Sequence, residues 1–453
     1  MKKYDLIVMG GGSAGMSMVQ PAAAKGWKTA LVEASYLGGT CINVGCIPSK
    51  TLLSSARVMQ SVRDAHKYGV MVEPPWADWA SMVARKDQLI ENMRHGSYEN
   101  VKKNDNIAFY EGRAAFTGPH TLEVNGESIT AEKIVIATGA RPAAPPVPGL
   151  GDVDYLTSTS AMEMKELPQS LLILGGGMIA LEFSQLFLRL GVEVTVIQRG
   201  DRLAANLEPE ISEEIRRVLE EEGANVKTGT NISSVGSEGD SVYVVDETDN
   251  GSVPYYADRI LVSTGRTPNS DMLHLEKVGV ETDKRGFLAV DQDFHTGVEG
   301  VWAIGDVIGG MMFTHKAWHD GLLLSRHLLK GEAIASTNRL NPFAVFTEPE
   351  IAGLGMGEEE AVKEGYEVKI QKFPFSSHGR ALATGKLDGF VKLVLDSSSG
   401  KILGGHIIGP EAGEVIHELV AAVRFGATVY DLKEMMHIHP TLSEAINSTA
   451  WSE

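Results

Sequence analysis

Two cysteines, Cys41 and Cys46, lie five positions apart in the stretch GGTCINVGCIPSK, and the chain of 453 residues has no others. The residues from Ile47 to Val62 have helical periodicity, so Cys46 is expected near the first turn, where a helix N-terminus favours a thiolate. A separation of five residues across a turn leaves the two thiols close enough to bridge. Two thiols are too few for a zinc site, and a disulfide that closes so short a loop adds little stability. The pair is therefore predicted to be a redox couple.

The elements around this pair follow a pattern that the chain repeats: a strand, a glycine turn, a helix and a second strand. The turns have the spacing G-x-G-x-x-G or G-x-G-x-x-A, and their key positions are Gly10, Gly12 and Gly15 in the first and Gly175, Gly177 and Ala180 in the second. In this pattern the first glycine makes the turn, the second lets the backbone approach a pyrophosphate, and the third lets helix pack on strand. The helix N-terminus then offers N–H groups to the phosphates. Two dinucleotide sites are therefore predicted.

The second strands of the two copies end differently. The first, KTALVEAS, ends at Glu33, where a carboxylate that binds ribose belongs, whereas the second, VEVTVIQRG, ends at Gln198 and Arg199. Without an acid there, a 2′-phosphate meets no repulsion and Arg199 is able to pair with it. The second site is predicted to prefer NADPH; the alternative is that Arg199 points to solvent and both nucleotides are accepted.

Later segments complete the predicted α/β architecture. IVIATGARP and ILVSTGRTPN are closing strands that end at Gly139 and Gly265, VEGVWAIGDVIGG is a strand ending at Gly305-Asp306, and THKAWHDGLLLSRHLL has a helical pattern. From about residue 340 the pattern becomes α+β. The acidic run EPEISEEIRRVLEEEG is predicted to be a helix whose charges form a solvated face.

The formal net charge of −18 argues against nucleic acid and acidic membranes as partners. The apolar part of MKKYDLIVMGGG is too short for a signal peptide, and no run of 18 apolar residues exists. A cytoplasmic location is predicted, where a redox-active cysteine pair is more plausible than a structural disulfide.

The motif GGTCINVGCIPSK resembles the redox-active motif of the flavoprotein disulfide reductases, which include dihydrolipoamide dehydrogenase, glutathione reductase and mercuric reductase. The resemblance covers the whole chain in order, ending with HIHPTLSEAI. It implies two Rossmann-like dinucleotide-binding domains of the glutathione-reductase type, a C-terminal α+β dimerisation domain, and a homodimer whose subunits share each active site. The segments implied are an FAD domain (1–145), an NAD(P)H domain (146–270), a return to the FAD domain (271–338) and the dimerisation domain (339–453).

The resemblance also implies residue roles. Cys46 would face the flavin and Cys41 would exchange with a small-molecule or protein-bound disulfide or dithiol, while Lys50 would lie near flavin N5 and pair with Glu182. FAD would be bound by Gly10, Gly12, Gly15, Glu33, Gly39, Thr40, Lys50, Thr138, Gly139, Asp306, Thr314 and His315. NAD(P)H would be bound by Gly175, Gly177, Ala180, Gln198, Arg199 and Gly265. No metal site is predicted.

Proton transfer is assigned to the segment MMHIHPTLSEAI. Pro440 suits the first position of a helix, so residues 441–447 are predicted to form a helix that carries Glu444. By resemblance His439 would be the acid/base for the exchanging thiol of the other subunit, and Glu444 would orient its imidazole. His437 is assigned a structural role.

Three functions stay open at this stage. IPSK, KFPFSSHGRALATGKLDGFVKL and HIHPTLSEAI are most similar to dihydrolipoamide dehydrogenase, which favours a disulfide reductase of that kind. MIALEFSQLFLRLG resembles the mercuric reductase branch, although the chain ends NSTAWSE without that branch's vicinal cysteines, so an NADPH-dependent metal-ion reductase is the alternative. The third is a subunit whose main role is docking to a lipoyl-carrier complex.

Overall fold

The computed structural model describes residues 1–334 and 340–452, and these fall into two compact units. The first unit comprises residues 1–52, 80–143 and the described part of 265–339, and the second comprises 53–79, 144–264 and the described part of 340–453. The division into four segments expected from the sequence stays a prediction, and its last boundary, between residues 338 and 339, lies outside the described residues.

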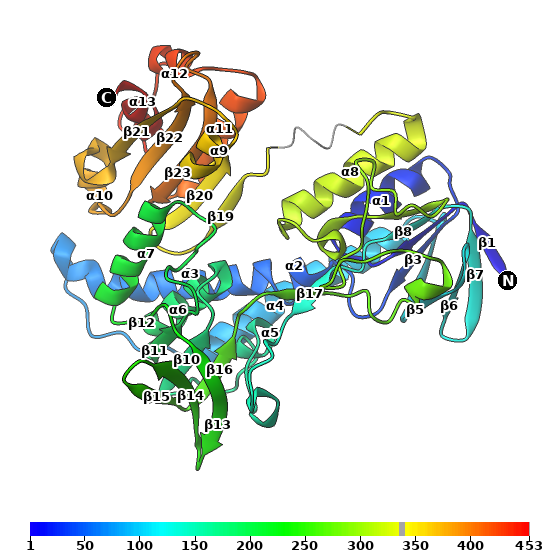
Figure 1. The fold of residues 1–453 in the computed structure, drawn as a ribbon, viewed down its shortest axis with the longest axis horizontal. Helices are drawn as coiled ribbons and strands as arrows, with labels where there is room; N and C mark the ends of the chain where they lie inside the picture. Colours follow the sequence, from blue (N-terminus) through cyan, green and yellow to red (C-terminus); the bar gives the residue numbers. More distant parts are fainter. Residues whose placement is uncertain (335–339, 453) are drawn as a thin grey trace. The chain divides into compact units, whose positions relative to one another are not determined.

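The first unit is built on a five-stranded parallel sheet in the order β18-β8-β2-β3-β4. Strand β2 has the sequence LIVM and is buried throughout, as expected for a parallel strand covered on both faces. Its alternate residues enter different cores: Leu6 and Val8 pack with helices α1 and α8, whereas Ile7 and Met9 pack with the smaller sheet β1-β7-β6-β5. The helices α1 and α8 lie side by side (Figure 1).

The elements of this unit are β1 (Lys2–Tyr4), β2 (Leu6–Met9), α1 (Ser13–Ala24), β3 (Thr29–Glu33), α2 (Gly39–Asn43), α3 (Cys46–Arg63), α4 (Trp79–Lys102), β4 (Ile107–Glu111), β5 (Ala114–Gly118), β6 (Thr121–Val124), β7 (Glu127–Ala131), β8 (Ile134–Ile136), β9 (Ala140–Pro142), β17 (Arg266–Pro268), β18 (Val301–Ala303), the 3-10 helix η4 (Gly305–Ile308) and α8 (Thr314–Lys330). Helices α3 and α4 extend beyond the unit at one end.

The second unit contains a parallel sheet in the order β12-β11-β10-β16, a three-stranded antiparallel sheet and a five-stranded antiparallel sheet in the order β19-β20-β23-β22-β21. Helices α11 and α13 pack against the last of these. The helices and strands are α5 (Ser158–Ala161), β10 (Ser170–Leu174), α6 (Met178–Arg189), β11 (Glu193–Ile197), α7 (Pro209–Glu221), β12 (Asn225–Lys227), β13 (Ile232–Glu238), β14 (Ser241–Thr248), β15 (Gly251–Ala257), β16 (Arg259–Val262), β19 (Phe343–Val345), β20 (Glu350–Gly355), α9 (Glu358–Lys363), β21 (Val368–Pro374), α10 (Gly379–Thr384), β22 (Phe390–Asp396), β23 (Ile402–Gly409), α11 (Ala412–Arg424), α12 (Val429–Glu434) and α13 (Glu444–Trp451).

The strand–turn–helix–strand repeat is confirmed in both units, and so is the α+β pattern predicted from about residue 340. Four strands end earlier than expected. The closing strands β8 and β16 end at Ile136 and Val262, each three residues before the predicted glycine, Gly139 or Gly265. Strand β11 ends at Ile197, before Gln198 and Arg199, and β18 ends at Ala303, after which η4 carries Asp306.

The prediction that the charges of the acidic run EPEISEEIRRVLEEEG form a solvated face is wrong in part. Lys392 of β22 is 1% exposed, and its ammonium donates to Glu208 at 2.6 Å, Glu210 at 2.8 Å and Glu358 at 2.9 Å. A buried cation needs this much compensation, because its hydration is lost. The beginning of the acidic run therefore holds a buried charge in place, while Glu221 at its other end stays exposed.

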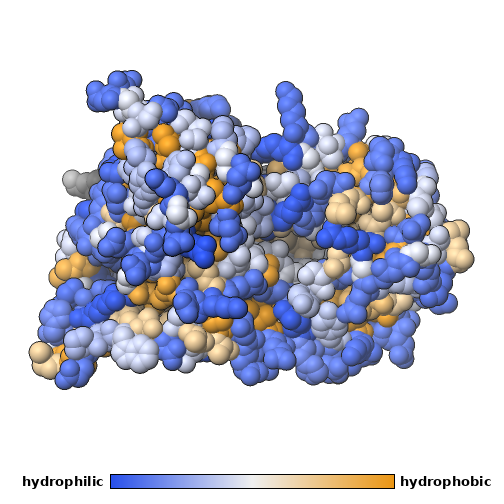
Figure 2. All heavy atoms as spheres, turned by 90° about the horizontal axis from the view of Figure 1, so that it is seen from below, coloured by the Kyte–Doolittle hydropathy of each residue, from blue (hydrophilic) through white to orange (hydrophobic). Residues whose placement is uncertain are grey.

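Hydrophilic residues cover most of the face shown in Figure 2, as the charge of the chain implies. Within the described residues, 1–334 and 340–452, no helix has the length and apolar content that crossing a membrane requires.

Candidate active site

The two cysteines lie at the junction of α2 and α3 in the first unit. Cys41 belongs to α2. Cys46 is the first residue of α3, which confirms its predicted position near the first turn of a helix. Neither thiol is bridged, and the Cys46 sulfur lies 3.2 Å from the hydroxyl of Thr314 at the start of α8. A hydrogen bond with Cys46, burial and the negative charge of Cys46 all raise the pKa of Cys41. Cys41 is therefore harder to ionise than an ordinary cysteine.

A cavity of about 420 Å³ opens at the carboxyl ends of β2 and β3, where ligands of open α/β sheets bind. Of the predicted residues, Gly10, Glu33 and Thr138 line it. The Glu33 carboxylate accepts a hydrogen bond from the Gly11 N–H and another from the Ser35 N–H, both at 2.7 Å. These bonds fix the carboxylate at the cavity wall, where it is placed to receive a ribose hydroxyl.

The glycines of the first turn, between β2 and α1, show whether the site fits a dinucleotide. A Cβ on Gly10 would lie 2.3 Å from the Ala137 carbonyl oxygen, and one on Gly15 would lie 1.9 Å from the Gly10 oxygen, so the protein's own backbone excludes both. At Gly12 the nearest atom, the Cα of Gly39, would be 3.7 Å away, which is ordinary contact. The packing of the chain therefore does not require glycine at position 12, whereas a pyrophosphate that approaches the backbone does.

The second turn repeats this division in the second unit. A Cβ on Gly175 would lie 2.7 Å from the Ser263 oxygen, whereas one on Gly177 would have no atom within 4 Å. Ala180 is fully buried in α6. As in the first turn, the first glycine is required by the packing of the chain, whereas the middle glycine has free space beside it. This arrangement fits a second dinucleotide.

The remaining residues assigned to FAD lie in the same unit. Gly39 faces Gly12, since a Cβ on Gly39 would lie 2.7 Å from the Gly12 Cα, and Thr40 and Lys50 lie in the cysteine helices. The strand end at Thr138 and Gly139 is held by Asn269, whose side-chain N–H donates to the Thr138 carbonyl at 2.9 Å and whose backbone N–H donates to the Gly139 carbonyl at 2.9 Å. His315 follows Thr314 in α8 and stacks on Phe313, with ring centroids 5.3 Å apart.

Asp306 lies in η4 among charged groups of the first unit. Burial raises the pKa of its carboxyl, and the nearby Arg266 and Lys316 cations oppose that rise. The Lys316 ammonium donates to the Asp320 carboxylate at 2.7 Å, and Asp320 is fully buried and also accepts the Gly305 N–H at 3.1 Å. Asp320 therefore fixes the start of η4, and Lys316 is already engaged.

The residues assigned to NAD(P)H belong to the second unit, except Gly265, which lies in the first and whose grouping with them stays a prediction. Gln198 follows β11, and its amide donates to the Arg202 carbonyl at 3.4 Å. Arg199 is exposed, and its guanidinium has no hydrogen bond or ion pair among the residues that the structure describes.

Lys50 and Glu182 lie in different units, so their pairing also stays a prediction. Glu182 is 6% exposed in α6, and its carboxylate accepts the Phe346 N–H at 3.0 Å. It is therefore a buried carboxylate rather than an ordinary surface charge.

His439 and Glu444 form a hydrogen-bonded dyad in the second unit. The imidazole Nδ1 and the Glu444 Oε1 are 2.9 Å apart, and the other carboxylate oxygen accepts the Thr441 N–H at 2.7 Å. These two contacts lower the pKa of Glu444, so it stays ionised. Because Nδ1 is engaged, Nε2 is the nitrogen left for proton transfer, and the His439 side chain is 78% exposed.

The local structure around this dyad corrects one expectation. Helix α13 begins at Glu444, not at Thr441, and Pro440 is not its first residue. The first backbone bonds at this end are short-range turns, from Ala445 to Leu442 and from Ile446 to Ser443. His437, by contrast, is nearly buried and pairs with Glu418 at 2.8 Å, which is consistent with a structural role.

Sequence reasoning missed two residues beside these groups. His378 is 4% exposed beside Phe373 and Phe375, and the charges of Glu444 and His439 act on it. Nothing in a single histidine ahead of α10 indicates such a position. Arg266, in the motif GRTPN, acts electrostatically on Asp306 and Cys46.

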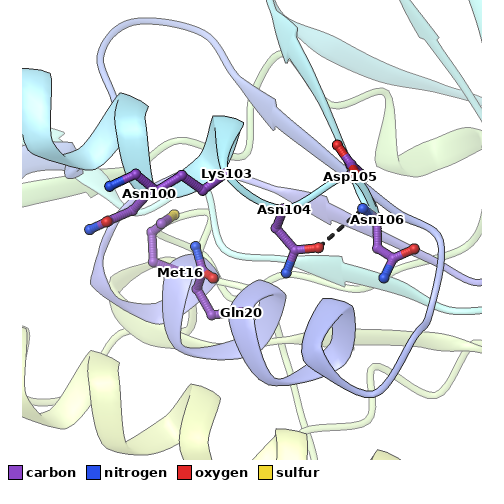
Figure 3. A pocket seen from close by; sticks show the side chains of 7 residues that line it. All are labelled: Met16, Gln20, Asn100, Lys103, Asn104, Asp105 and Asn106. Carbon is purple, nitrogen blue, oxygen red and sulfur yellow. Dashed lines mark hydrogen bonds between the residues drawn. The ribbon is translucent and has the colours of Figure 1, made fainter.

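A second cavity of the first unit, of about 620 Å³, is open and is lined mostly by polar residues (Figure 3). None of the residues predicted from the sequence line it. Asn104 lines it, and its side-chain oxygen accepts the Asn106 N–H at 3.1 Å (Figure 3).

Comparison with known proteins now identifies this arrangement. Residues 4–321 match the family described as "Pyridine nucleotide-disulphide oxidoreductase", and residues 341–450 match the dimerisation domain of the same family. The chain belongs to the pyridine nucleotide-disulphide oxidoreductase family. It is therefore an oxidoreductase of the flavoprotein disulfide reductase type, and the cofactors of the family are FAD and NAD(P)H.

Relatives within the family carry two different names. The chain is 38% identical to a mercuric reductase of Staphylococcus aureus, covering 99% of this chain and 82% of the relative. It is 39% identical to a dihydrolipoyl dehydrogenase of Thermus scotoductus, covering 99% of this chain and 97% of the relative. Among solved structures, the HOCl-induced flavoprotein disulfide reductase RclA of Escherichia coli matches with a TM-score of 0.90 and 30% identity, over 99% of both chains.

Proposed function

We propose that this protein is a dihydrolipoamide-dehydrogenase-like disulfide reductase that uses Cys41 and Cys46 as its redox pair. The observation that carries the proposal is the asymmetry of the pair, in which Cys46 begins α3 beside Thr314 while hydrogen bonding to Cys46 raises the pKa of Cys41. Such a pair has one stabilised thiolate and one thiol that needs a base to react.

The cysteines perform the exchange. FAD, when bound, supplies a two-electron relay between NAD(P)H and the Cys41–Cys46 disulfide. Two electrons and one proton convert that disulfide into a Cys41 thiol and a Cys46 thiolate. Deprotonated Cys41 attacks one sulfur of the substrate disulfide and releases the first substrate thiol. Cys46 then attacks the Cys41 sulfur, which releases the second substrate sulfur as a thiolate and restores the disulfide. That thiolate takes its proton from solvent, and oxidation of a dithiol follows the reverse path.

The dyad handles the proton of this exchange. His439 takes the proton from Cys41 through Nε2 and delivers it to the leaving substrate thiolate, and Glu444 holds the imidazole through Nδ1. The dimerisation domain at residues 341–450 supports a homodimer, in which the dyad of one subunit serves the cysteines of the other. Gly10, Gly12, Gly15 and Glu33 would bind the ADP part of FAD, and Asp306 its ribityl chain. A cytoplasmic location suits a chain whose only cysteines form a redox pair.

A substrate panel tests this proposal. The holoenzyme is assayed with NADPH against lipoamide, glutathione disulfide, Hg(II) and Cu(II), beside the Cys41→Ser/Cys46→Ser double variant as a blank. We expect lipoamide to have the highest kcat/KM, by about tenfold or more, because the sequence segments around the site are most similar to that branch. If Hg(II) or Cu(II) is turned over while activity with lipoamide is no higher than that of the blank, the proposed substrate is rejected. The assignment of the chain to its family would not be affected.

A metal-ion reductase is the second candidate. Two observations favour it: the mercuric reductases reach 38% identity, nearly that of the dihydrolipoyl dehydrogenases, and RclA, a neighbour at TM-score 0.90, has been solved as a Cu(II) complex. The same two thiols would hold the ion, since no group of three or more His, Cys, Asp or Glu side chains suited to a metal occurs among the described residues.

For the nucleotide we propose a preference for NADPH, supported by the exposed Arg199 after β11 and the absence of an acid there. Replacing Arg199 by Glu is expected to lower kcat/KM for NADPH by about tenfold or more, because a cation that pairs with the 2′-phosphate becomes an anion that repels it. Activity with NADH is expected to stay equal or rise.

Arg259→Glu is the matched control for Arg199→Glu. Arg259 is also an exposed arginine, but it lies at the start of β16, whereas Arg199 follows the end of β11. The two residues therefore lie at opposite ends of the parallel sheet β12-β11-β10-β16. It should leave both nucleotides unaffected. Equal activity of the unmodified enzyme with NADH and NADPH, or a loss in Arg199→Glu that is the same for both, would refute the preference.

A further inference from the structure

The cavity at the carboxyl ends of β2 and β3 has a second wall, which comes from the segment 269–273 directly after β17. Backbone hydrogen bonds fix this segment at both ends. The Asn269 N–H donates to the Gly139 carbonyl at 2.9 Å, and the Leu273 carbonyl accepts the Phe116 N–H at 2.9 Å. A part of the chain far from Glu33 in sequence is thus anchored on both sides of the same cavity.

Arg141 of β9, which also lines the cavity, holds the middle of this segment. One terminal nitrogen of its guanidinium lies 3.1 Å from one Asp271 carboxylate oxygen, and the other lies 2.9 Å from the second oxygen. The first nitrogen also donates to the Pro268 carbonyl at 3.0 Å and to the Asn269 side-chain oxygen at 3.1 Å. We call the bidentate pair of Arg141 and Asp271 the clasp.

The clasp lies where the cavity meets solvent. The side chains of Arg141 and Asp271 are 46% and 58% exposed, although both residues line the cavity. A second contact of the same kind lies beside it, because the Arg113 guanidinium is 2.8 Å from the Met272 sulfur and both residues are exposed and line the cavity. Two contacts between distant segments therefore bridge this part of the rim.

The pairing of β9 with β17 does not require the clasp. The antiparallel ladder already joins residues 140–142 to residues 266–268, and Asn269 continues the contact beyond the ladder. Asp271 is bound further on, at the cavity itself. Exposed ion pairs usually contribute little, and the bidentate arginine–carboxylate geometry is the exception. The position of the clasp thus points to a role toward the group that the cavity holds.

We propose that Arg141 and Asp271 are positioning residues for FAD, and that their ion pair closes the rim of the cavity over the ADP part of the cofactor and slows its release. Both terminal nitrogens of Arg141 are engaged by the chain. The clasp therefore acts by holding the segment 269–273 in place, and not by pairing Arg141 with the pyrophosphate. This inference rests on the placement of FAD proposed above for Gly10 and Glu33, and it does not depend on the roles of the two cysteines.

The test measures how fast the holoenzyme releases FAD. A phosphodiesterase in excess hydrolyses free FAD to FMN, which fluoresces more strongly, so the rise in fluorescence follows dissociation. We expect Asp271→Asn and Arg141→Gln each to release FAD about fivefold faster or more, because a bidentate ion pair is lost. The double variant should be no faster than Arg141→Gln alone, since both changes break the same pair.

Salt provides a readout that a purely structural role would not change. Charges at the rim are screened by salt, so added NaCl should accelerate release from the unmodified protein more than from Asp271→Asn. Arg285→Gln is the matched control. Arg285 is also an exposed arginine of the first unit that pairs with an aspartate, Asp283 at 3.5 Å, but it does not line the cavity. This variant should release FAD at the rate of the unmodified protein.

Unchanged release in Asp271→Asn would overturn the proposal. Slower release would also overturn it, because it would show that Arg141 binds FAD directly once Asp271 no longer holds it. If Arg141→Gln retains no FAD, Asp271→Asn, the smaller change, decides alone.

Glu33→Gln tests the placement of FAD separately and should accelerate release at low and at high salt. If it has no effect, FAD does not occupy this cavity, and the clasp fails together with that part of the proposed function. If Glu33→Gln accelerates release and Asp271→Asn does not, the clasp alone is refuted.

Discussion

Replacing Cys41 by serine is expected to reduce turnover of a disulfide substrate by about 10³-fold or more, because the nucleophile of the exchange is removed. Cys46 is unable to replace it, since its sulfur is directed to the Thr314 hydroxyl at 3.2 Å inside the first unit. The remaining Cys46 thiolate no longer has a partner with which to form the disulfide. The variant should therefore show the long-wavelength thiolate–flavin band even before any reductant is added, while NADPH still bleaches its flavin.

Cys46→Ser is the comparison that separates the two roles. It should also lose turnover, but it should lack the band in every redox state, because the thiolate that produces it is absent. Stopped-flow reduction by NADPH and steady-state assays with lipoamide measure both properties on the same preparation. Disulfide reduction by Cys41→Ser at more than about a tenth of the original rate, or a band in Cys46→Ser but not in Cys41→Ser, would reverse or refute the assignment.

The sequence predicted most of the scaffold because its signals are local. The run LIVM before Gly10 and the run LLIL before Gly175 are each buried on both faces, and such runs are apolar throughout. The spacing of the glycines also predicts the geometry of the two turns, since neither Gly10 nor Gly175 has space for a side chain next to its closing strand. The position of Cys46 at the start of α3 follows from periodicity that begins immediately after it.

The sequence did not predict features that depend on contacts between distant segments. Lys392 has the same residue type as the exposed lysines, and only the approach of Glu208, Glu210 and Glu358 makes its burial possible. Arg266 lies in a motif that the sequence marks only as the end of a strand, while its charge acts on Asp306 and Cys46, which are far away along the chain. No propensity or spacing rule contains such information, because burial of a charge is decided by tertiary packing.

The start of α13 shows the same limit on a smaller scale. Proline at the first position of a helix is a sound general rule, and it predicted a helix from Thr441. In the structure the Glu444 carboxylate takes the Thr441 N–H at 2.7 Å and the imidazole of His439 at 2.9 Å, and the regular helix begins only at Glu444. The segment before the helix therefore serves the dyad, and a rule about average helices does not foresee it.

Replacing His439 by glutamine should lower kcat/KM for a disulfide substrate by about 10² to 10⁴-fold, the usual contribution of a positioned acid/base. Reduction of the flavin by NADPH should be unaffected, because the dyad acts on Cys41 and on the leaving thiol. Glu444→Gln should cause a smaller loss, since it keeps a side chain of the same shape but removes the charge that holds Nδ1–H. Because the pKa of Glu444 is held below its ordinary value of 4.5, the hydrogen bond should survive acidification until pH falls below that value.

His437→Gln is the matched control for His439, two residues away and also paired with a glutamate. Its imidazole contacts Glu418 at 2.8 Å and is nearly buried, so the substitution should lower the melting temperature while kcat/KM changes by about twofold or less. Equal kinetic losses in the two variants would show that His439 is a structural histidine as well.

Mixed dimers decide whether the dyad serves the other subunit. When Cys41→Ser and His439→Gln chains carrying different tags are produced together and the mixed dimer is isolated, a site shared between subunits combines the intact Cys41 of one chain with the intact His439 of the other. One of the two sites in each mixed dimer is then complete, so about half of the original turnover should return although each parent is inactive. If instead each chain used its own dyad, both sites would lack one group and the mixed dimer would be as inactive as its parents.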